Sequence, residues 1–186
     1  MDDKSVILCL IVFVGTLIFT PVIYGKKLKV QQLIGYRELR TNLPGGRQVN
    51  SATMRACIVN ADGTGRKVLA EELIKDANTW TSGVGWSLDG KIATFGLGWE
   101  DPENAKWEEK NNQFRYEQGW LVDVFFMEVA TGKLTNMTAI ERVSNYNSGG
   151  TFMDKENKKI AFTALIDGVS HPFTMDFDGT NKKDIS

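Results

Sequence analysis

A phrase of turn and strand residues recurs in this chain, and this repetition limits the available folds more than any other feature. The fullest copy, residues 85–95, joins a Trp-Ser-Leu-Asp-Gly turn to a strand, and a looser copy spans residues 150–162. Asp-Gly or Thr-Gly pairs at 62–63, 131–132 and 178–179 supply the positive φ angles of tight hairpins. Short strands and turns repeated in this way predict β-propeller blades.

The spacing of the copies predicts about three repeat units within residues 26–186, at approximately 32–69, 84–138 and 149–186. Ile92 and Ile160, which hold the same place in two copies, lie 68 positions apart. A blade usually takes about 40–45 residues, and an insertion from Gly98 to Gly119 accounts for most of the excess. Between the first two units, residues 70–77 contain helix formers and predict two helical turns.

The phrases resemble those of a known family. Residues 86–95 (Trp-Ser-Leu-Asp-Gly-Lys-Ile-Ala-Thr-Phe) look like the W-S-P-D-G-K-x-I-A-F phrase of TolB-type, WD-like β-propeller repeats. Residues 59–69 and 175–183 look like the V-M-N-x-D-G-T phrase of the same family. Leu88 replaces the usual proline, and the third unit lacks the Trp-Ser pair. The resemblance implies an all-β propeller fold and says little about function.

Three blades do not close a ring, because propellers of this kind have about 4–8 blades. We therefore expect an incomplete propeller, the N-terminal part of a longer one. If the chain is complete, copies of it would have to close a ring by self-association.

The N-terminal segment, residues 1–25, is predicted to be a signal peptide or a membrane anchor. Val6 to Tyr24 is an almost continuous apolar stretch, at the short end of the length needed to span a bilayer as a helix. No small residues mark a cleavage site, so a retained anchor and a cleaved signal both remain open. Both predict a periplasmic or other extracytoplasmic location, and a retained anchor predicts membrane association through residues 6–24. The lysines at 26, 27 and 29 instead favour an orientation that places the chain after the apolar stretch on the cytoplasmic side of the membrane.

Charge and residue usage exclude several classes of function. The chain has 22 basic and 23 acidic residues, a net charge of -1, which gives no field to attract nucleic acid. His171 is the single histidine, and no G-x-S-x-G motif accompanies it. With two cysteines, the chain also lacks the ligands of a typical metal site. We therefore predict no catalytic residues, no metal and no cofactor.

The insertion is the segment that the repeat does not require, and function concentrates on such loops. Its aromatic residues, set among carboxylates, suit the binding of a partner protein. The predicted partner-binding residues are Trp99, Trp107, Phe114, Tyr116 and Trp120. The alternative is that these rings only hold the loop against its blade.

Together these features predict a non-catalytic, TolB-like propeller scaffold that binds a protein partner at the cell envelope. The alternative function is the propeller portion of an enzyme, because similar propellers occur in prolyl-oligopeptidase-type peptidases and in oligogalacturonide lyases. The peptidase would need a hydrolase domain downstream, and the lyase would need several metal ligands.

Overall fold

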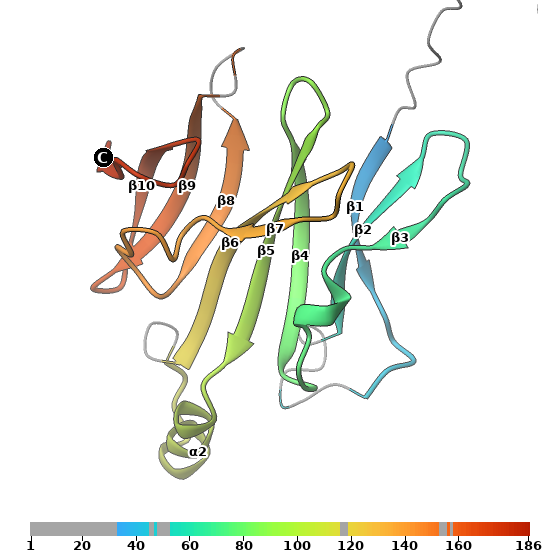
Figure 1. Ribbon diagram of the computed structural model, residues 1–186. Helices are drawn as coiled ribbons and strands as arrows, with labels where there is room; N and C mark the ends of the chain where they lie inside the picture. Colours follow the sequence, from blue (N-terminus) through green and yellow to red (C-terminus); the bar gives the residue numbers. More distant parts are fainter. Residues whose placement is uncertain (1–32, 45–46, 48–52, 116–118, 153–155, 157) are drawn as a thin grey trace, which may run out of the picture. The chain divides into compact units, whose positions relative to one another are not determined.

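The computed structural model describes residues 33–44, 47, 53–115, 119–152, 156 and 158–186 (Figure 1). The predicted signal peptide or anchor, residues 1–25, lies outside the described residues, and so does the predicted N-terminal helix. Among the described residues, no helix combines the length and the apolar character needed to cross a membrane.

The described residues form three antiparallel sheets in which each strand pairs with the next along the chain. The first sheet contains β1 (Leu33–Leu39), β2 (Met54–Asn60) and β3 (Lys67–Val68). The second contains β4 (Thr79–Trp86), β5 (Ile92–Glu100), β6 (Trp120–Glu128) and β7 (Leu134–Asn136). The third contains β8 (Asn147–Phe152), β9 (Lys159–Ile166), β10 (Val169–Asp176) and β11 (Lys183–Asp184).

Four antiparallel strands in chain order are the unit of a β-propeller, and the second and third sheets have this form. The first sheet has three strands in the described part of the chain. Its short last strand, β3, corresponds to β7 and β11. Among the described residues, the first sheet therefore lacks the first strand of a unit, which β4 and β8 provide in the other two sheets. The all-β fold with propeller-like units is thus confirmed.

The same hairpin turn recurs in the first and third sheets with matching hydrogen bonds. The Asp62 carboxylate accepts from the backbone N–H (3.0 Å) and the hydroxyl (2.6 Å) of Thr64. Asp178 accepts from the same two groups of Thr180 at 3.0 and 2.6 Å. The glycine that follows each aspartate has a positive φ, 82° and 86°, which glycine adopts without strain. The internal repeat seen in the sequence is therefore a repeat of geometry.

Apolar side chains fill the space between neighbouring sheets. Ile58 of the first sheet packs in one cluster with Phe95 and Phe125 of the second. Phe126 belongs to another cluster with Phe162 of the third sheet. Adjacent residues of a strand point to opposite faces, so Phe125 and Phe126 bury both faces of β6. This explains why β6 is almost uniformly apolar instead of alternating.

One carboxylate interrupts β6. Asp123 is 1% exposed, and both of its oxygens accept hydrogen bonds. The donors are the Arg142 guanidinium (2.9 Å twice), the Asn136 amide (2.7 Å) and the Thr138 hydroxyl (2.9 Å). A buried charge is tolerated when it is paired and hydrogen-bonded in this way. The group fastens β7 and the chain after it to the centre of β6.

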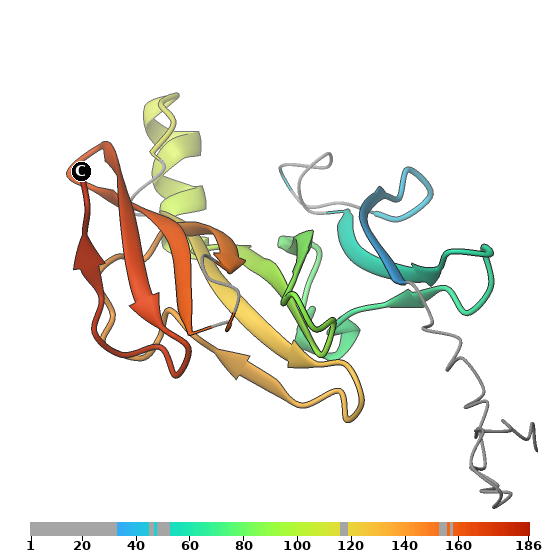
Figure 2. The same cartoon turned by 90° about the horizontal axis from the view of Figure 1, so that it is seen from above.

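Two local predictions were wrong. Residues 70–77 form a single 3₁₀ turn, η1 (Glu71–Leu73), because Ala70 has a left-handed conformation and Ile74 is extended. The insertion begins later than expected, since β5 continues through Glu100. It also contains a helix, α2 (Pro102–Asn111), which lacks the apolar periodicity that would have predicted it. Both views show α2 beyond the ends of β5 and β6 (Figures 1 and 2).

Candidate functional site: the helical insertion

The helix α2 begins and ends with recognisable signals. Asp101 precedes it and accepts a hydrogen bond from the backbone N–H of Glu103 at 2.8 Å, and Pro102 occupies the first turn. Both residues favour a helix start. Asn112 ends the helix in a left-handed conformation, with φ of 51°. The backbone N–H of Asp101 donates to the Gly119 carbonyl at 2.8 Å, which closes the base of the insertion.

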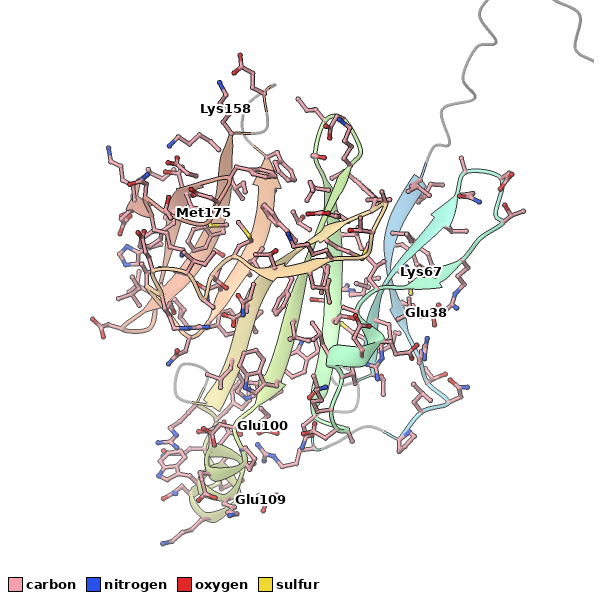
Figure 3. The ribbon with its side chains drawn as sticks, viewed as in Figure 1. Glu38, Lys67, Glu100, Glu109, Lys158 and Met175 are labelled. Atoms are coloured by element: carbon pink, nitrogen blue, oxygen red, sulfur yellow. The ribbon has the colours of Figure 1, made fainter. Side chains whose placement is uncertain are left out.

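Arg47 fastens the helix to the sheets. Its guanidinium donates to Glu100 at 2.6 Å and also forms an ion pair with Glu108 on α2. The two glutamates are 6% and 5% exposed, and Arg47 supplies the opposite charge that a buried carboxylate needs. Arg47 comes from the connection between β1 and β2, the counterpart in the first sheet of the β5–β6 connection. Figure 3 shows Glu100 where β5 meets the helix, with Glu109 on α2 itself.

Asn104 and Arg115 complete the hydrogen bonds of Glu108. The carboxylate accepts from the Asn104 amide at 2.9 Å and from the backbone N–H of Arg115 at 2.7 Å. Burial by itself raises the pKa of Glu108, but these hydrogen bonds and Arg47 outweigh it and hold the pKa below its ordinary value. The hydrogen bond to Glu100 raises the pKa of Arg47. Arg47 and Glu108 therefore stay ionised at neutral pH, and their ion pair keeps α2 in one orientation.

Three of the predicted aromatic residues take part in the insertion. The Arg115 guanidinium lies 3.7 Å from the ring centroid of half-buried Trp107. Phe114 is 52% exposed, and its ring contacts that of Trp120 with centroids 5.5 Å apart. Trp120 is buried and contacts Trp80 of β4 at 5.2 Å. The contacts of Trp120 with Phe114 and Trp80 anchor the insertion, while the Phe114 side chain stays exposed.

The predicted residues do not all share one surface. Trp99 pairs with Leu121 in the β5–β6 ladder, and Glu100 pairs with Trp120. Trp99 and Trp120 therefore project from opposite faces of the second sheet, and Trp99 packs against the core shared with the first sheet. Tyr116 lies outside the described residues.

Sequence reasoning missed the residues that hold the insertion in place. Arg47, Asn104 and Arg115 carried no pattern that connected them, because their contacts join distant parts of the chain. Asp123 did carry a signal, since a lone carboxylate within an apolar strand must find partners.

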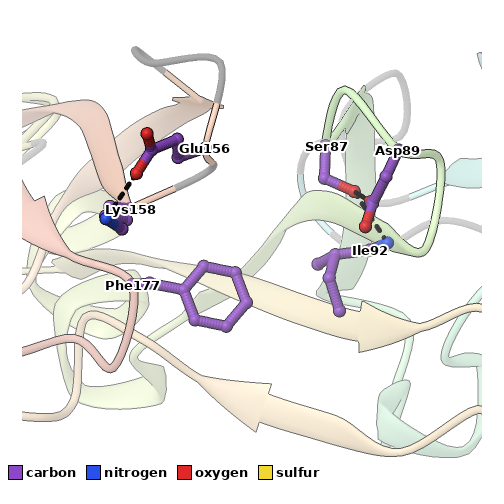
Figure 4. A pocket seen from close by; sticks show the side chains of 6 residues that line it. All are labelled: Ser87, Asp89, Ile92, Glu156, Lys158 and Phe177. Carbon is purple, nitrogen blue, oxygen red and sulfur yellow. Dashed lines mark hydrogen bonds and ion pairs between the residues drawn. The ribbon is translucent and has the colours of Figure 1, made fainter.

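A second concave region lies at the other end of β5. Figure 4 shows Phe177 between Ile92 and the Ser87–Asp89 turn on one side and the Glu156–Lys158 pair on the other. The Ser87 hydroxyl donates to the Asp89 carboxylate at 2.7 Å and accepts from the backbone N–H of Ile92 at 3.0 Å.

The geometry around His171 differs from that of a catalytic triad. Its Nδ1 lies 2.9 Å from an Asp184 carboxylate oxygen and 3.4 Å from the Ser186 hydroxyl. In a triad the acid and the nucleophile engage different ring nitrogens, whereas here both contact the same one. Within the described residues, no group of three or more His, Cys, Asp or Glu side chains is arranged to hold a metal ion.

No protein-family model matches the chain, and no curated protein matches it in sequence. Among solved structures, it is similar to TolB from Acinetobacter baumannii, with a TM-score of 0.49 and 15% identity over 73% of this chain and 27% of that one. It is also similar to an oligogalacturonate lyase in complex with manganese (TM-score 0.49, 14% identity, 71% of this chain and 35% of that one). A third is oligogalacturonate lyase from Vibrio parahaemolyticus (TM-score 0.47, 12% identity, 71% and 35%).

The chain spans 27–35% of the length of these structures. TolB, whose repeat phrases this sequence resembles, is among them.

Proposed function

We propose that this chain is a non-catalytic, TolB-like propeller scaffold that binds a protein partner through the surface of its helical insertion. The insertion surface consists of Trp107, Phe114 and Arg115 together with the exposed charged residues of α2. These charged residues are Glu103, Lys106, Glu109 and Lys110.

One observation carries the proposal. Phe114 remains 52% exposed although the base of the insertion is fixed by the buried ion pairs of Arg47. Exposed apolar rings on a rigid support are suited to binding, because little conformational freedom is lost when the partner docks. Aromatic and arginine side chains also dominate the binding energy of protein interfaces.

The second sheet does not need the insertion for its own completion. In the third sheet the corresponding strands, β9 and β10, are joined by Asp167 and Gly168 alone. Residues 101–119 thus add a surface to a strand pair that a two-residue turn can close. This favours a role in recognition over a role in stability.

Placement at the cell envelope is part of the proposal and rests on the apolar stretch from Val6 to Tyr24. We expect the full-length chain to remain with washed membranes and residues 26–186 to be released. Equal release of both forms would contradict membrane association through residues 6–24.

Site-specific photocrosslinking in the native cells tests the partner surface. A benzophenone amino acid at Phe114 is expected to yield one discrete adduct in the full-length chain. The same group at Lys67, which is exposed on β3 of the first sheet, is the control and is expected to yield none. Trp107→Ala and Arg115→Ala should each reduce the adduct at position 114.

Two results would contradict the proposal. One is a folded chain that gives no adduct at position 114, or the same adducts at positions 67 and 114. The other is catalytic turnover by the purified chain. Eliminative cleavage of pectic oligomers or hydrolysis of peptides would favour the alternative, the propeller portion of an enzyme.

A further inference from the structure

A groove lies at the junction of the second and third sheets, at the end of β5 opposite to the insertion. It consists of two adjoining hollows of about 280 and 310 Å³. Both are lined by Ile92 and Phe177, so these two side chains lie where the hollows meet. We call it the Phe177 groove.

The floor of the Phe177 groove is aromatic. The Phe177 ring centroid lies 5.6 Å from that of Phe126 and 6.2 Å from that of Phe152. The ring is nevertheless 41% exposed. One side of it therefore packs against Phe126 of the second sheet and Phe152 of the third, while the other faces the groove.

The hairpin turn does not require an aromatic residue here. Phe177 precedes Asp178 in the turn that the third sheet shares with the first, and Ala61 occupies the same place before Asp62. The turn closes with the same hydrogen bonds around alanine as around phenylalanine. The exposed ring therefore calls for an explanation beyond the local fold.

Carboxylates outnumber cations along the groove. Its acidic residues are Asp89, Glu128, Glu156 and Asp178, and its basic residues are Lys133 and Lys158. Each lysine lies beside a glutamate, Lys133 at 3.6 Å from Glu128 and Lys158 in an ion pair with Glu156.

The two aspartates supply the excess negative charge. Asp89 pairs at 3.3 Å with Lys91, whose side chain is 79% exposed, and such a surface pair is weak. Asp178 accepts hydrogen bonds from Thr180 and has no ion pair within the described part of the chain. Hydrogen bonds from Ser87 and Thr180 lower the pKa of Asp89 and Asp178, respectively, so both are ionised at neutral pH.

We propose that the Phe177 groove binds a basic segment of a partner protein, with an arginine or lysine side chain over the open face of Phe177. A cation over an aromatic face is attracted by the ring, and the aliphatic stem of the side chain packs on apolar surface. The carboxylates of Asp89 and Asp178 attract the same charge. This site is separate from the insertion surface and does not depend on it.

The test uses the full-length chain and three short capped peptides with one variable residue between two leucines. The arginine peptide is expected to bind with a dissociation constant on the order of 1 mM, which NMR or calorimetric titration measures. Citrulline, the neutral analogue of arginine, should weaken binding several-fold, and glutamate should abolish it. Raised salt should weaken binding of the arginine peptide.

Variants locate the site. Phe177→Leu keeps an apolar side chain against Phe126 and is expected to weaken the arginine peptide about 3-fold. Asp178→Asn keeps an acceptor for Thr180 while it removes the charge, and it should weaken binding by a similar factor. Val169→Ala, at a residue that is 57% exposed at a hairpin far from the groove, is the matched control and should change nothing. Thermal unfolding confirms that each variant is folded.

Three results would overturn the inference: equal binding of the arginine and citrulline peptides, unchanged binding by folded Phe177→Leu and Asp178→Asn, or no binding at about 10 mM peptide. Trp107→Ala should leave peptide binding unchanged. The outcome for the groove is thereby kept apart from the outcome for the insertion surface.

Discussion

The guanidinium of Arg142 and the carboxylate of Asp123 form two parallel hydrogen bonds of 2.9 Å each. Asp123 lies in the middle of β6, a strand that is buried on both of its faces. Arg142 reaches Asp123 from the connection between β7 and β8. A bidentate pair of this kind combines charge with directed geometry. It holds the edge of the second sheet to its most buried strand.

Arg142→Ala should therefore destabilise the protein strongly. The substitution leaves the Asp123 charge buried with only neutral donors, and breaking a buried pair costs about 3–5 kcal/mol. Urea unfolding followed by circular dichroism measures the free energy of unfolding. Arg142→Lys, which keeps the charge but loses the second hydrogen bond, should lose less. A loss below about 1 kcal/mol for Arg142→Ala would show that the pair matters little.

The same pair predicts a loss of stability in acid. Burial raises the pKa of Asp123, but the hydrogen bonds from Arg142, Asn136 and Thr138 outweigh it and hold the pKa below its ordinary value of 3.8. The unfolded chain then binds the proton more readily than the folded one, so stability is full above about pH 4 and falls as the pH drops through the folded pKa. Asp123→Asn should show a smaller loss of unfolding free energy between neutral and acid pH.

Trp120→Ala and Phe114→Ala should separate packing from binding. Trp120 is 5% exposed between Trp80 and Phe114, and removal of a buried tryptophan side chain costs about 3–5 kcal/mol. Phe114 is half exposed, so its removal should cost about 1 kcal/mol or less. Chemical unfolding measures both. A large loss for Phe114→Ala would favour the view that the rings only hold the insertion in place.

Gly119→Ala should destabilise the insertion, because a Cβ atom at this position would lie 1.8 Å from the side-chain Cγ of Asn104. Asn104 is buried and hydrogen-bonded to Glu108 and Arg115, so it cannot move away at low cost. Gly96→Ala is the control, since its nearest neighbours would lie at an ordinary 3.5 Å. The thermal midpoint should fall by several degrees for Gly119→Ala and stay nearly constant for Gly96→Ala. Equal midpoints would contradict the close approach.

Arg47→Ala should loosen α2 more than the sheets. It removes the cation shared by the buried carboxylates of Glu100 and Glu108. Hydrogen exchange of the amides in residues 102–111 should become faster, while exchange in β9 and β10 stays slow. Lys106→Ala, which removes an exposed ion pair with Glu103 on the same helix, is the control and should have little effect. Uniform acceleration across all sheets would instead indicate global destabilisation.

Local features of the sequence predicted the fold class well. The Asp-Gly turns at residues 62–63 and 178–179 adopt the expected tight hairpins, since the conformation that glycine permits is a property of a few adjacent residues. The prediction of two helical turns for residues 70–77 was wrong. Helix propensity is a weak preference that tertiary contacts can override, and the backbone is already extended at Ile74.

The candidate site was predicted only in part. Composition pointed to the insertion and to its aromatic residues, but it could not assign a face to each ring. Trp99 and Trp120 differ in that respect because the β5–β6 register places them on opposite sides. The Phe177 groove was not foreseen, because its lining comes from two sheets whose packing no short segment encodes.

The sequence by itself determined the all-β class, the repeated turns and the position of the segment that the repeat does not need. These depend on the conformations of neighbouring residues and on patterns that repeat along the chain. Only the tertiary structure decided that Arg47 forms ion pairs with Glu100 and Glu108, and that Arg142 forms one with Asp123. Such pairs form between residues that sheet packing brings together. A charged residue requires a partner only when it is buried, and burial is set by the tertiary structure.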